Sequence, residues 1–470
     1  MREHFFKNSK LLPLCLIFIL MWSVKCHGLS RDKYVYTAPQ QTGDGWETDF
    51  LGNMNIDVIK IIELMHNILD GSYKNIHSVL LVKSGKLVLE EYFDGFNGEK
   101  LHEIRSATKS IGSILVGIAI DHRFIKGIDE RVYTYFKDYE LEEKWDKRAK
   151  YVTLKALLTM TSGYDCDDHA TPPFECERKM HKTNDWVKYA LNLPMAFQPG
   201  KHWAYNSSSL ILVSEIISKT SKISVSEFAN RYLFEPLGIS GFQWGLSPKG
   251  RVWLAGNAKM RPRDMAKFGY MVLNGGTWKG NQIVSKAWIE ESTTSHTKSK
   301  NNRDYGYLWW RGKHLINNQL IEGYWAEGNG GQCIFICPKV DLVAVFNGGN
   351  YNSPLELQPL GMLIDYILPS MLPPAVPRRY AKLDSKALNA LVGEYKFQDY
   401  HLTIFRERDK LYGRIFGQTT EAFPLTKNRL IVPWKFVGST QVDIFRYKTG
   451  VVKHLLVYSA FTTMQFDKFK

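Results

Sequence analysis

A serine and a lysine three residues apart stand at the start of an apolar stretch. In LHEIRSATKSIGSILVGIAIDH, Ser106 precedes Lys109 at a spacing that puts both side chains on one helix face. Apolar residues follow with helical periodicity, at Ile111, Ile114, Leu115 and Ile118. Burial would lower the pKa of Lys109, so that its amine could accept the proton of Ser106. The alternative is an ordinary helix start, with Ser106 as the N-cap and Lys109 in solvent.

The Ser-x-x-Lys spacing is not specific by itself. It also occurs at Ser30 and Lys33 and at Ser295 and Lys298, both in polar, irregular sequence. Ser106 differs because it would stand at the N-terminus of a buried helix. Free backbone amides and the positive end of the helix dipole stabilise an alkoxide or oxyanion there. This setting favours the catalytic interpretation of Ser106.

A second segment, FQPGKHWAYNSSSLILVSEIISK, supplies a group that could transfer protons. A turn at Pro199 and Gly200 precedes Tyr205, and an apolar helical pattern follows. A tyrosine on the loop before a helix can reach into a cleft, where a nearby lysine would stabilise its anion. Ser207 could relay a proton or hold Lys109. The alternative is a tyrosine that merely packs on its neighbours.

Two hairpins and the helical patterns between them must position these residues. SVLLVKSGKLVLEEYF predicts a hairpin that turns at Ser84 and Gly85. QCIFICPKVDLVAVFNGG predicts a second hairpin, with Pro338 and Asp341 near its turn. Strands at both ends with helices between them predict one large α/β domain over residues 29–367.

A proline-rich stretch divides the chain. Residues 368–379, LPSMLPPAVPRR, read as a stiff, extended linker. Residues 380–470 then alternate apolar and polar side chains between turn residues, which predicts a small antiparallel β domain.

The positive charge is concentrated at the C-terminal end. Residues 371–470 hold 17 Lys and Arg against 8 Asp and Glu, which is nine of the 14 net positive charges. A soluble basic surface is the preferred interpretation, with weak attraction to an anionic membrane or cell wall as the alternative. No nucleic-acid-reading motif is visible, so no nucleic-acid partner is expected. The oligomeric state stays open.

The N-terminus predicts export. Basic residues precede a short apolar block, shorter than the ~20 residues of a membrane-spanning helix, so residues 1–28 read as a signal peptide. An uncleaved signal anchor is the alternative. Secretion, or release into the periplasm, is therefore the expected location.

Export would permit disulfide bonds. Cys166 and Cys176 bracket DDHATPPFE and are the expected pair, closing a surface loop rather than a lid over a cleft. Cys333 and Cys337 on one strand would lie roughly 13 Å apart, too far to bond each other. No cysteine spacing suggests a zinc site, and neither metal nor cofactor is expected.

The order of these motifs resembles a known superfamily. Ser-x-x-Lys, a Tyr-x-Ser or Tyr-x-Asn motif about a hundred residues later, and then a glycine-rich strand end are the layout of the penicillin-recognising serine hydrolases. The chain resembles class C β-lactamases, D,D-carboxypeptidases, family VIII esterases and, most closely, 6-aminohexanoate-dimer hydrolases. The similarity runs from about Asn75 to Leu368 and includes IRSATKS, TLKALLTMTSGYD, FQPGKHWAYNSSS, FEPLGI, YGYLWW and EGNGGQCIFICPKVDLVAVFNGGNY.

The resemblance implies a β-lactamase/transpeptidase-like sheet flanked by helices, with a helical subdomain. It implies that Ser106 is the nucleophile and Lys109 its general base. Tyr205 would carry the proton to the leaving group, with Ser207 in support. A small barrel-like C-terminal domain is also common among such enzymes.

The resemblance also implies an oxyanion hole. Its donors would be the backbone N–H of Ser106 and one from the strand around Ala326, Gly328 and Asn329. Losing one such donor typically costs ~10²–10³ in rate. The glycines of this segment would let a substrate approach the strand backbone closely.

Two departures from the family pattern bear on the substrate. The Lys-Thr-Gly motif occurs only at residues 448–450, where it reads as a hairpin turn. The expected strand, GYWAEGNGGQ, holds no lysine or histidine, and Ser207 stands where β-lactamases use asparagine. Both favour esters or linear amides over β-lactams. The alternative is a catalytically silent relative that binds a cell-wall fragment, peptide or lipid.

Two further features are ambiguous. Asn206 begins an N-glycosylation sequon, yet a glycan there would block the cleft, so we expect it to be buried and unmodified. Trp309 and Trp310 are equally compatible with an acyl pocket and with the core.

Overall fold

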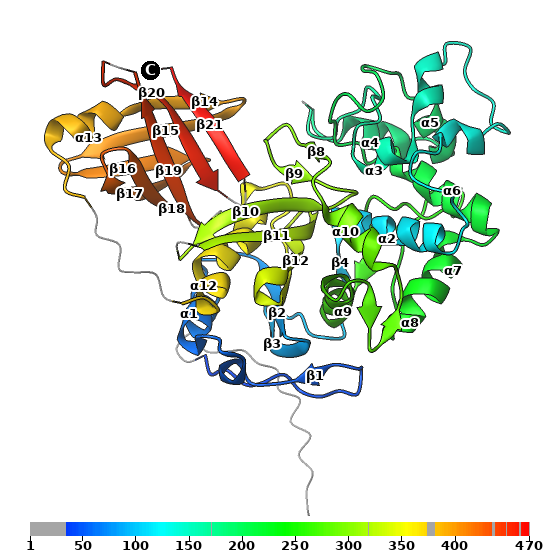
Figure 1. Ribbon diagram of the computed structural model, residues 1–470, viewed down its shortest axis with the longest axis horizontal. Helices are drawn as coiled ribbons and strands as arrows, with labels where there is room; N and C mark the ends of the chain where they lie inside the picture. Colours follow the sequence, from blue (N-terminus) through cyan, green and yellow to red (C-terminus); the bar gives the residue numbers. More distant parts are fainter. Residues whose placement is uncertain are drawn as a thin grey trace, which may run out of the picture.

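The computed structural model describes residues 34–170, 172–317, 319–373, 381–434, 438–447, 449–459 and 462–469 (Figure 1). The predicted signal peptide, 1–28, lies outside the described residues. The first three residues of the predicted linker form helix α12, Leu368–Ser370, and residues 374–379 of it lie outside the described range.

A nine-stranded sheet forms the centre of the main domain, in the order β1-β3-β2-β13-β12-β11-β10-β9-β8. Neighbouring strands are antiparallel except for the parallel pair β1 and β3. The N-terminal hairpin therefore lies beside β13, so both ends of the domain share one sheet. The strands are β1 Glu47–Thr48, β2 Ile76–Lys83, β3 Lys86–Tyr92, β8 Thr297–Lys298, β9 Asp304–Tyr305, β10 Trp310–Ile316, β11 Gln319–Gly328, β12 Gln332–Cys337 and β13 Leu342–Gly348.

Both predicted hairpins are confirmed. Ser84 and Gly85 connect β2 to β3 with φ of 50° and 79°, the left-handed conformation that a two-residue hairpin turn requires. Pro338 begins the turn between β12 and β13, and Asp341 ends it with φ of 44°. Cys333 and Cys337 both lie buried on β12 as free thiols.

Helices cover the sheet and build a separate subdomain. Helix α9 packs on β2, β12 and β13, and Figure 1 shows α1 and α12 on the other side. The helical subdomain, from α3 to α8, continues away from the sheet. The helices of the main domain are α1 Val58–Leu69, α2 Thr108–Asp121, α3 Leu154–Leu158, α4 Glu175–His181, α5 Trp186–Leu191, α6 Leu210–Ser221, α7 Val225–Ala229, α8 Glu235–Leu237, α9 Pro262–Leu273, α10 Lys286–Thr293, α11 Gln358–Met362 and α12.

Helix α2 is more buried than its periodicity predicts. Every residue from Thr108 to Ala119 is buried, not only the isoleucine face. The cause is its position, because β11, α6 and α10 all pack against it. Figure 1 shows it between the sheet and the helical subdomain.

The C-terminal β domain is a closed, antiparallel, eight-stranded barrel, which confirms the predicted antiparallel domain. It sits against the main domain through Ser439, whose N–H donates to Asp365 at 2.7 Å, and through Asn301, whose amide donates to the Tyr400 hydroxyl at 3.0 Å. Its elements are α13 Ser385–Leu391, β14 Gly393–Phe397, β15 Tyr400–Glu407, β16 Lys410–Ile415, β17 Gln418–Thr426, β18 Arg429–Trp434, β19 Gly438–Arg446, β20 Val452–Ser459 and β21 Thr462–Lys468.

In the part of the chain that the structure describes, no helix combines the length and apolar character needed to cross a membrane.

A glycine lets helix α10 approach α2. A Cβ on Gly117 would lie 2.2 Å from the indole of Trp288, which also donates to the Ser113 carbonyl at 3.0 Å. Only a residue without a side chain fits at this crossing.

We predict that Gly117→Ala destabilises the protein by about 1–3 kcal/mol, because the added methyl displaces the Trp288 ring in a packed core. Urea unfolding followed by tryptophan fluorescence measures this change. Gly127→Ala is the matched control, since no atom lies within 4 Å of a Cβ at Gly127. Equal stability of the two variants would contradict the prediction.

Candidate active site

Ser106 and Lys109 form the centre of the site. Ser106 lies in the 3₁₀ turn Arg105–Ala107, directly before α2, and is partly exposed. Lys109 is only 2% exposed; its Nζ lies 2.9 Å from Ser106 Oγ and donates to the Ala255 carbonyl at 2.8 Å. Lys109 is therefore not the solvated first-turn lysine of the alternative interpretation.

Burial changes the chemistry of Lys109. Loss of hydration lowers the pKa of Lys109 to about 8, although the negative charges of Asp168 and Glu177 act to raise it. About one molecule in ten then carries a neutral amine at pH 7. The side chain can therefore act as a base toward the neighbouring hydroxyl.

Tyr205 comes from the loop before α6, as its position in the sequence predicts. Its ring centre is 4.7 Å from Lys109 Nζ, and its hydroxyl hydrogen-bonds the Ser106 side chain. The expectation that a lysine would favour the phenolate is wrong, because burial raises the pKa of Tyr205 well above its usual value. The phenol keeps its proton and can donate it.

Aromatic rings fix the plane of Tyr205. The imidazole of His169 stacks on it, with centroids 4.7 Å apart and an 8° interplanar angle. Trp310 lies beside it at 6.1 Å and 21°. Trp309 is fully buried and stacks on Phe268, so it belongs to the core, whereas Trp310 belongs to the site.

The loop between Cys166 and Cys176 reaches the site. The expected disulfide is present, but the expectation of a mere surface loop is wrong. The loop carries the fully buried Asp168 and the exposed His169, and Glu177 follows it on α4. Sequence reasoning missed these three residues. The only signal in the sequence was the polar run Asp-Asp-His between Cys166 and Cys176.

Ser207 contacts Asp168 rather than Lys109. Its backbone N–H donates to Asp168 Oδ2 at 2.8 Å, and its hydroxyl bonds the same carboxylate. Its carbonyl accepts from the Trp253 indole at 3.1 Å. The structure therefore places Ser207 one contact away from the reacting groups.

The end of β11 packs on the turn that holds Ser106. A Cβ on Gly328 would lie 2.3 Å from the Ile104 carbonyl oxygen, so this glycine is required by the close approach of two backbones. The pairing with β10 stops at Trp310 and Trp325, one residue before Ala326. The backbone edge of 326–328 thus has β12 as a partner on one side only.

The side chain of Asn329 is bonded to Asn352. Its amide donates to Asn352 Oδ1 at 2.8 Å, and its Oδ1 accepts from the Asn352 N–H at 2.8 Å. A contribution of Ala326, Gly328 or Asn329 to an oxyanion hole through the backbone remains a prediction.

A cation does lie near this strand, but a carboxylate neutralises it. Arg303 binds both oxygens of Glu327, at 2.6 and 3.2 Å, and its guanidinium lies 4.1 Å from the Trp310 ring centre. The Trp325 indole also donates to Glu327 at 2.8 Å.

Burial and the Glu327 charge raise the pKa of nearby Glu356 to about 7. Of the Lys-Thr-Gly motif, Thr449 and Gly450 lie between β19 and β20 of the barrel, and Lys448 lies outside the described residues.

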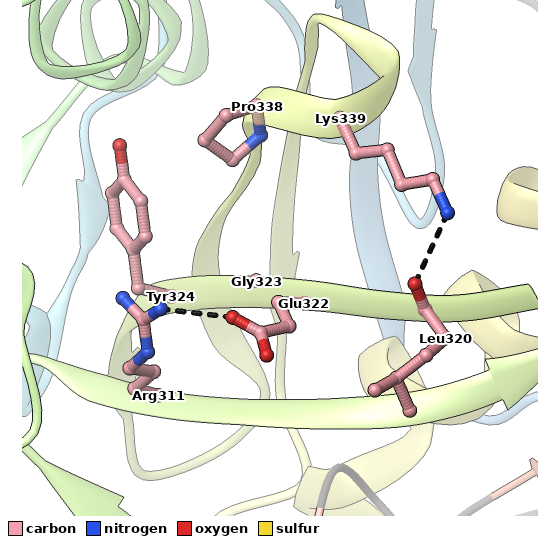
Figure 2. Close-up of a pocket in the computed structure, with 7 residues that line it drawn as sticks. All are labelled: Arg311, Leu320, Glu322, Gly323, Tyr324, Pro338 and Lys339. Atoms are coloured by element: carbon pink, nitrogen blue, oxygen red, sulfur yellow. Dashed lines mark hydrogen bonds and ion pairs between the residues drawn. The ribbon is translucent and has the colours of Figure 1, made fainter.

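A separate hollow of about 410 Å³ lies over the middle of β10 and β11 (Figure 2). Its polar groups are paired: Arg311 with Glu322 at 2.9 Å, and Lys339 with the Leu320 carbonyl at 3.2 Å. Its lining contains none of the residues around Ser106. Within the described ranges, no cluster of three or more His, Cys, Asp or Glu is placed to hold a metal ion.

Comparison with known proteins agrees with this geometry. The beta-lactamase family model matches residues 77–355. The chain belongs to this family. Membership confirms the resemblance to the penicillin-recognising serine hydrolases, and the sheet with flanking helices confirms the expected fold class.

Individual members of the family are distant from this chain. Penicillin-binding protein 4* of Bacillus subtilis is 23% identical over 416 residues, covering 76% of this chain and 85% of that protein. A putative 6-aminohexanoate-dimer hydrolase structure from Bacillus anthracis has a TM-score of 0.52 and 19% identity, over 60% of this chain and 76% of that one. The octameric penicillin-binding protein homologue from Pyrococcus abyssi has a TM-score of 0.52 and 17% identity, over 88% and 100%.

We predict that Asn206 carries no glycan, because it is 1% exposed and its Oδ1 already accepts from the Ser209 N–H. Peptide mapping after expression in a glycosylating host checks this. Glu99→Thr is the positive control, since it places a sequon at the exposed Asn97. A glycan found on Asn206 would rule out the site described here.

We predict that phosphonylation of Ser106 by a fluorophosphonate becomes faster with rising pH, with a midpoint at about 8, because only the neutral Lys109 accepts a proton. Stopped assays with intact-mass detection give the rate at each pH. Lys109→Arg, which stays protonated, should lose ~10²–10⁴ in rate. A flat profile between pH 6 and 10 would contradict the assignment of Lys109 as the base.

Proposed function

We propose that the protein is a serine hydrolase that cleaves ester or linear amide bonds through an acyl-enzyme on Ser106. One observation carries this proposal. A fully desolvated lysine, whose pKa burial lowers to about 8, lies 2.9 Å from the Ser106 hydroxyl oxygen. A structural lysine gains nothing from such a position, whereas a general base needs it.

Acylation follows from the contacts. Lys109 Nζ takes the Ser106 proton as Oγ attacks the carbonyl carbon of the substrate. The oxyanion would lie toward the Ser106 N–H and the 326–329 backbone. Tyr205, which hydrogen-bonds Ser106 and retains its proton, donates that proton to the departing alcohol or amine. The Lys109 ammonium returns a proton to Tyr205, and water then hydrolyses the acyl-enzyme to a carboxylic acid.

The charges near β11 favour a neutral acyl group. Two cations lie near the end of β11, and both are already paired: Glu327 binds Arg303 through both carboxylate oxygens, and Glu103 binds Arg105 at 2.9 Å. A substrate carboxylate would have to displace one of these carboxylates to be held there. Esters and linear amides are therefore better substrates than β-lactams, whose carboxylate needs a free cation.

We also infer that the protein is exported. The basic and apolar pattern of residues 1–28 supports a signal peptide. The Cys166–Cys176 disulfide supports an oxidising compartment, because thiols are kept reduced in the cytosol.

We predict that one fluorophosphonate adduct forms per molecule of wild-type protein and that none forms on Ser106→Ala. Intact-mass measurement followed by peptide mapping locates the adduct. Ser295→Ala is the matched control, because Ser295 precedes Lys298 at the same spacing but is exposed and bonded to Asp304. This control should label like wild type.

Turnover is then tested with p-nitrophenyl esters, linear amide dimers and nitrocefin. We expect turnover of the first two classes and loss of ~10³ or more in the Ser106→Ala variant. A folded wild-type protein without adduct or turnover would instead support the alternative, a silent relative that binds a wall fragment, peptide or lipid.

A further inference from the structure

We propose that Asp168 is a positioning residue of this active site: its buried carboxylate is the counter-ion of Lys109, and its hydrogen bonds hold the Tyr205–Ser207 segment against the nucleophile. This inference rests on the proposed function, in which Lys109 becomes an ammonium during acylation. It assigns a catalytic purpose to the disulfide-closed loop.

One residue fixes both ends of the proton-donor segment. The Asp168 N–H donates to the Tyr205 carbonyl at 2.7 Å. Its Oδ2 accepts from the Ser207 N–H at 2.8 Å. These hydrogen bonds therefore fix the position of Tyr205 relative to Asp168.

The loop around Asp168 is closed on itself. The Asp168 carbonyl accepts from the Phe174 N–H at 2.9 Å, and the Cys166–Cys176 disulfide joins the ends of the loop. Asp168 lies two residues after Cys166 and is fully buried. The disulfide thus limits how far the carboxylate can move.

The carboxylate is buried without full hydrogen bonding. Asp168 Oδ1 has no hydrogen-bond partner among the described residues, which is unfavourable for a buried acceptor. A nearby positive charge offsets such a cost. Of the charges acting on Lys109, Asp168 is the strongest. Burial raises the pKa of Asp168 above its usual value, and the Ser207 hydrogen bonds and the Lys109 charge oppose that rise.

This charge matters when the proton moves. Transfer from Ser106 leaves an ammonium on a side chain that is 2% exposed. Water cannot stabilise it there, so the fixed carboxylate must. The groups in contact with Lys109 are the Ser106 hydroxyl, the Ala255 carbonyl and the Tyr205 ring. The charges of Asp168 and, more weakly, Glu177 act on it without a direct ion pair.

The test is the pH profile of fluorophosphonate labelling in wild type, Asp168→Asn and Glu177→Gln. Removing the Asp168 charge lowers the pKa of Lys109, so the labelling midpoint of Asp168→Asn should move to lower pH by about one unit, a tenfold change in the proton equilibrium. The plateau rate should also fall, because the ammonium is less stable. Glu177→Gln should shift the midpoint less.

A purely structural role predicts a different result. A folded Asp168→Asn with a reduced rate but the wild-type midpoint, or with a midpoint at higher pH, would overturn the inference. Should Asp168→Asn not fold, Asp168→Ser decides: it removes the same charge with a smaller side chain, and its midpoint must also move to lower pH. An unmoved midpoint there overturns the inference and leaves the proposed function standing. Absence of labelling in wild type overturns both.

Discussion

The removal of one lysine from water governs the architecture around it. An ammonium in a packed interior is strongly unfavourable, so Lys109 is tolerated only as a partly neutral amine with close polar partners. The Ser106 hydroxyl and the Ala255 carbonyl supply those contacts, and Asp168 supplies the opposite charge. To keep solvent away, α2 must be covered along nearly its whole length, and residues 108–119 are indeed all buried. Under the proposed mechanism, the reactivity of Ser106 would depend on the packing of α2 and not on the motif alone.

Two separately built parts of the domain meet at this helix. The sheet contributes β11, whose end can approach the Ser106 turn because Gly328 has no side chain. The helical subdomain contributes Tyr205, held between His169 and Trp310 by stacking. Each part positions one side of the reacting centre, which explains why the site lies at their junction. The barrel contacts the main domain through Asp365 and Asn301, outside this junction.

Local pattern was sufficient for some features and insufficient for others. The hairpins at Ser84 and at Pro338, the helix after Ser106 and the loop carrying Tyr205 follow from periodicity and turn residues over a few positions. Asp168, Glu177 and the Arg303–Glu327 pair could not be found in this way, because their partners come from other segments of the chain. The sequence gives only a weak indication that α2 is buried on all sides. The faces opposite to and beside the isoleucines carry small residues, which close packing on those faces requires. These residues are Ser110, Gly112, Ser113 and Gly117. The role of Gly328 was expected to concern the substrate, whereas its immediate constraint is the approach of two backbones.

The strand order has a consequence for how each newly made chain folds. Leu80 of β2 pairs with Val345 of β13, so the N-terminal hairpin finds its neighbour only after nearly the whole domain has been synthesised. Contacts of such large separation along the chain form slowly, whereas the helices between them have mostly local contacts and can collapse first. The Ser106 turn acquires its support from β11 at the same late stage. Before the sheet closes, Lys109 is hydrated, so the proposed activation of Ser106 would begin only once this support is in place.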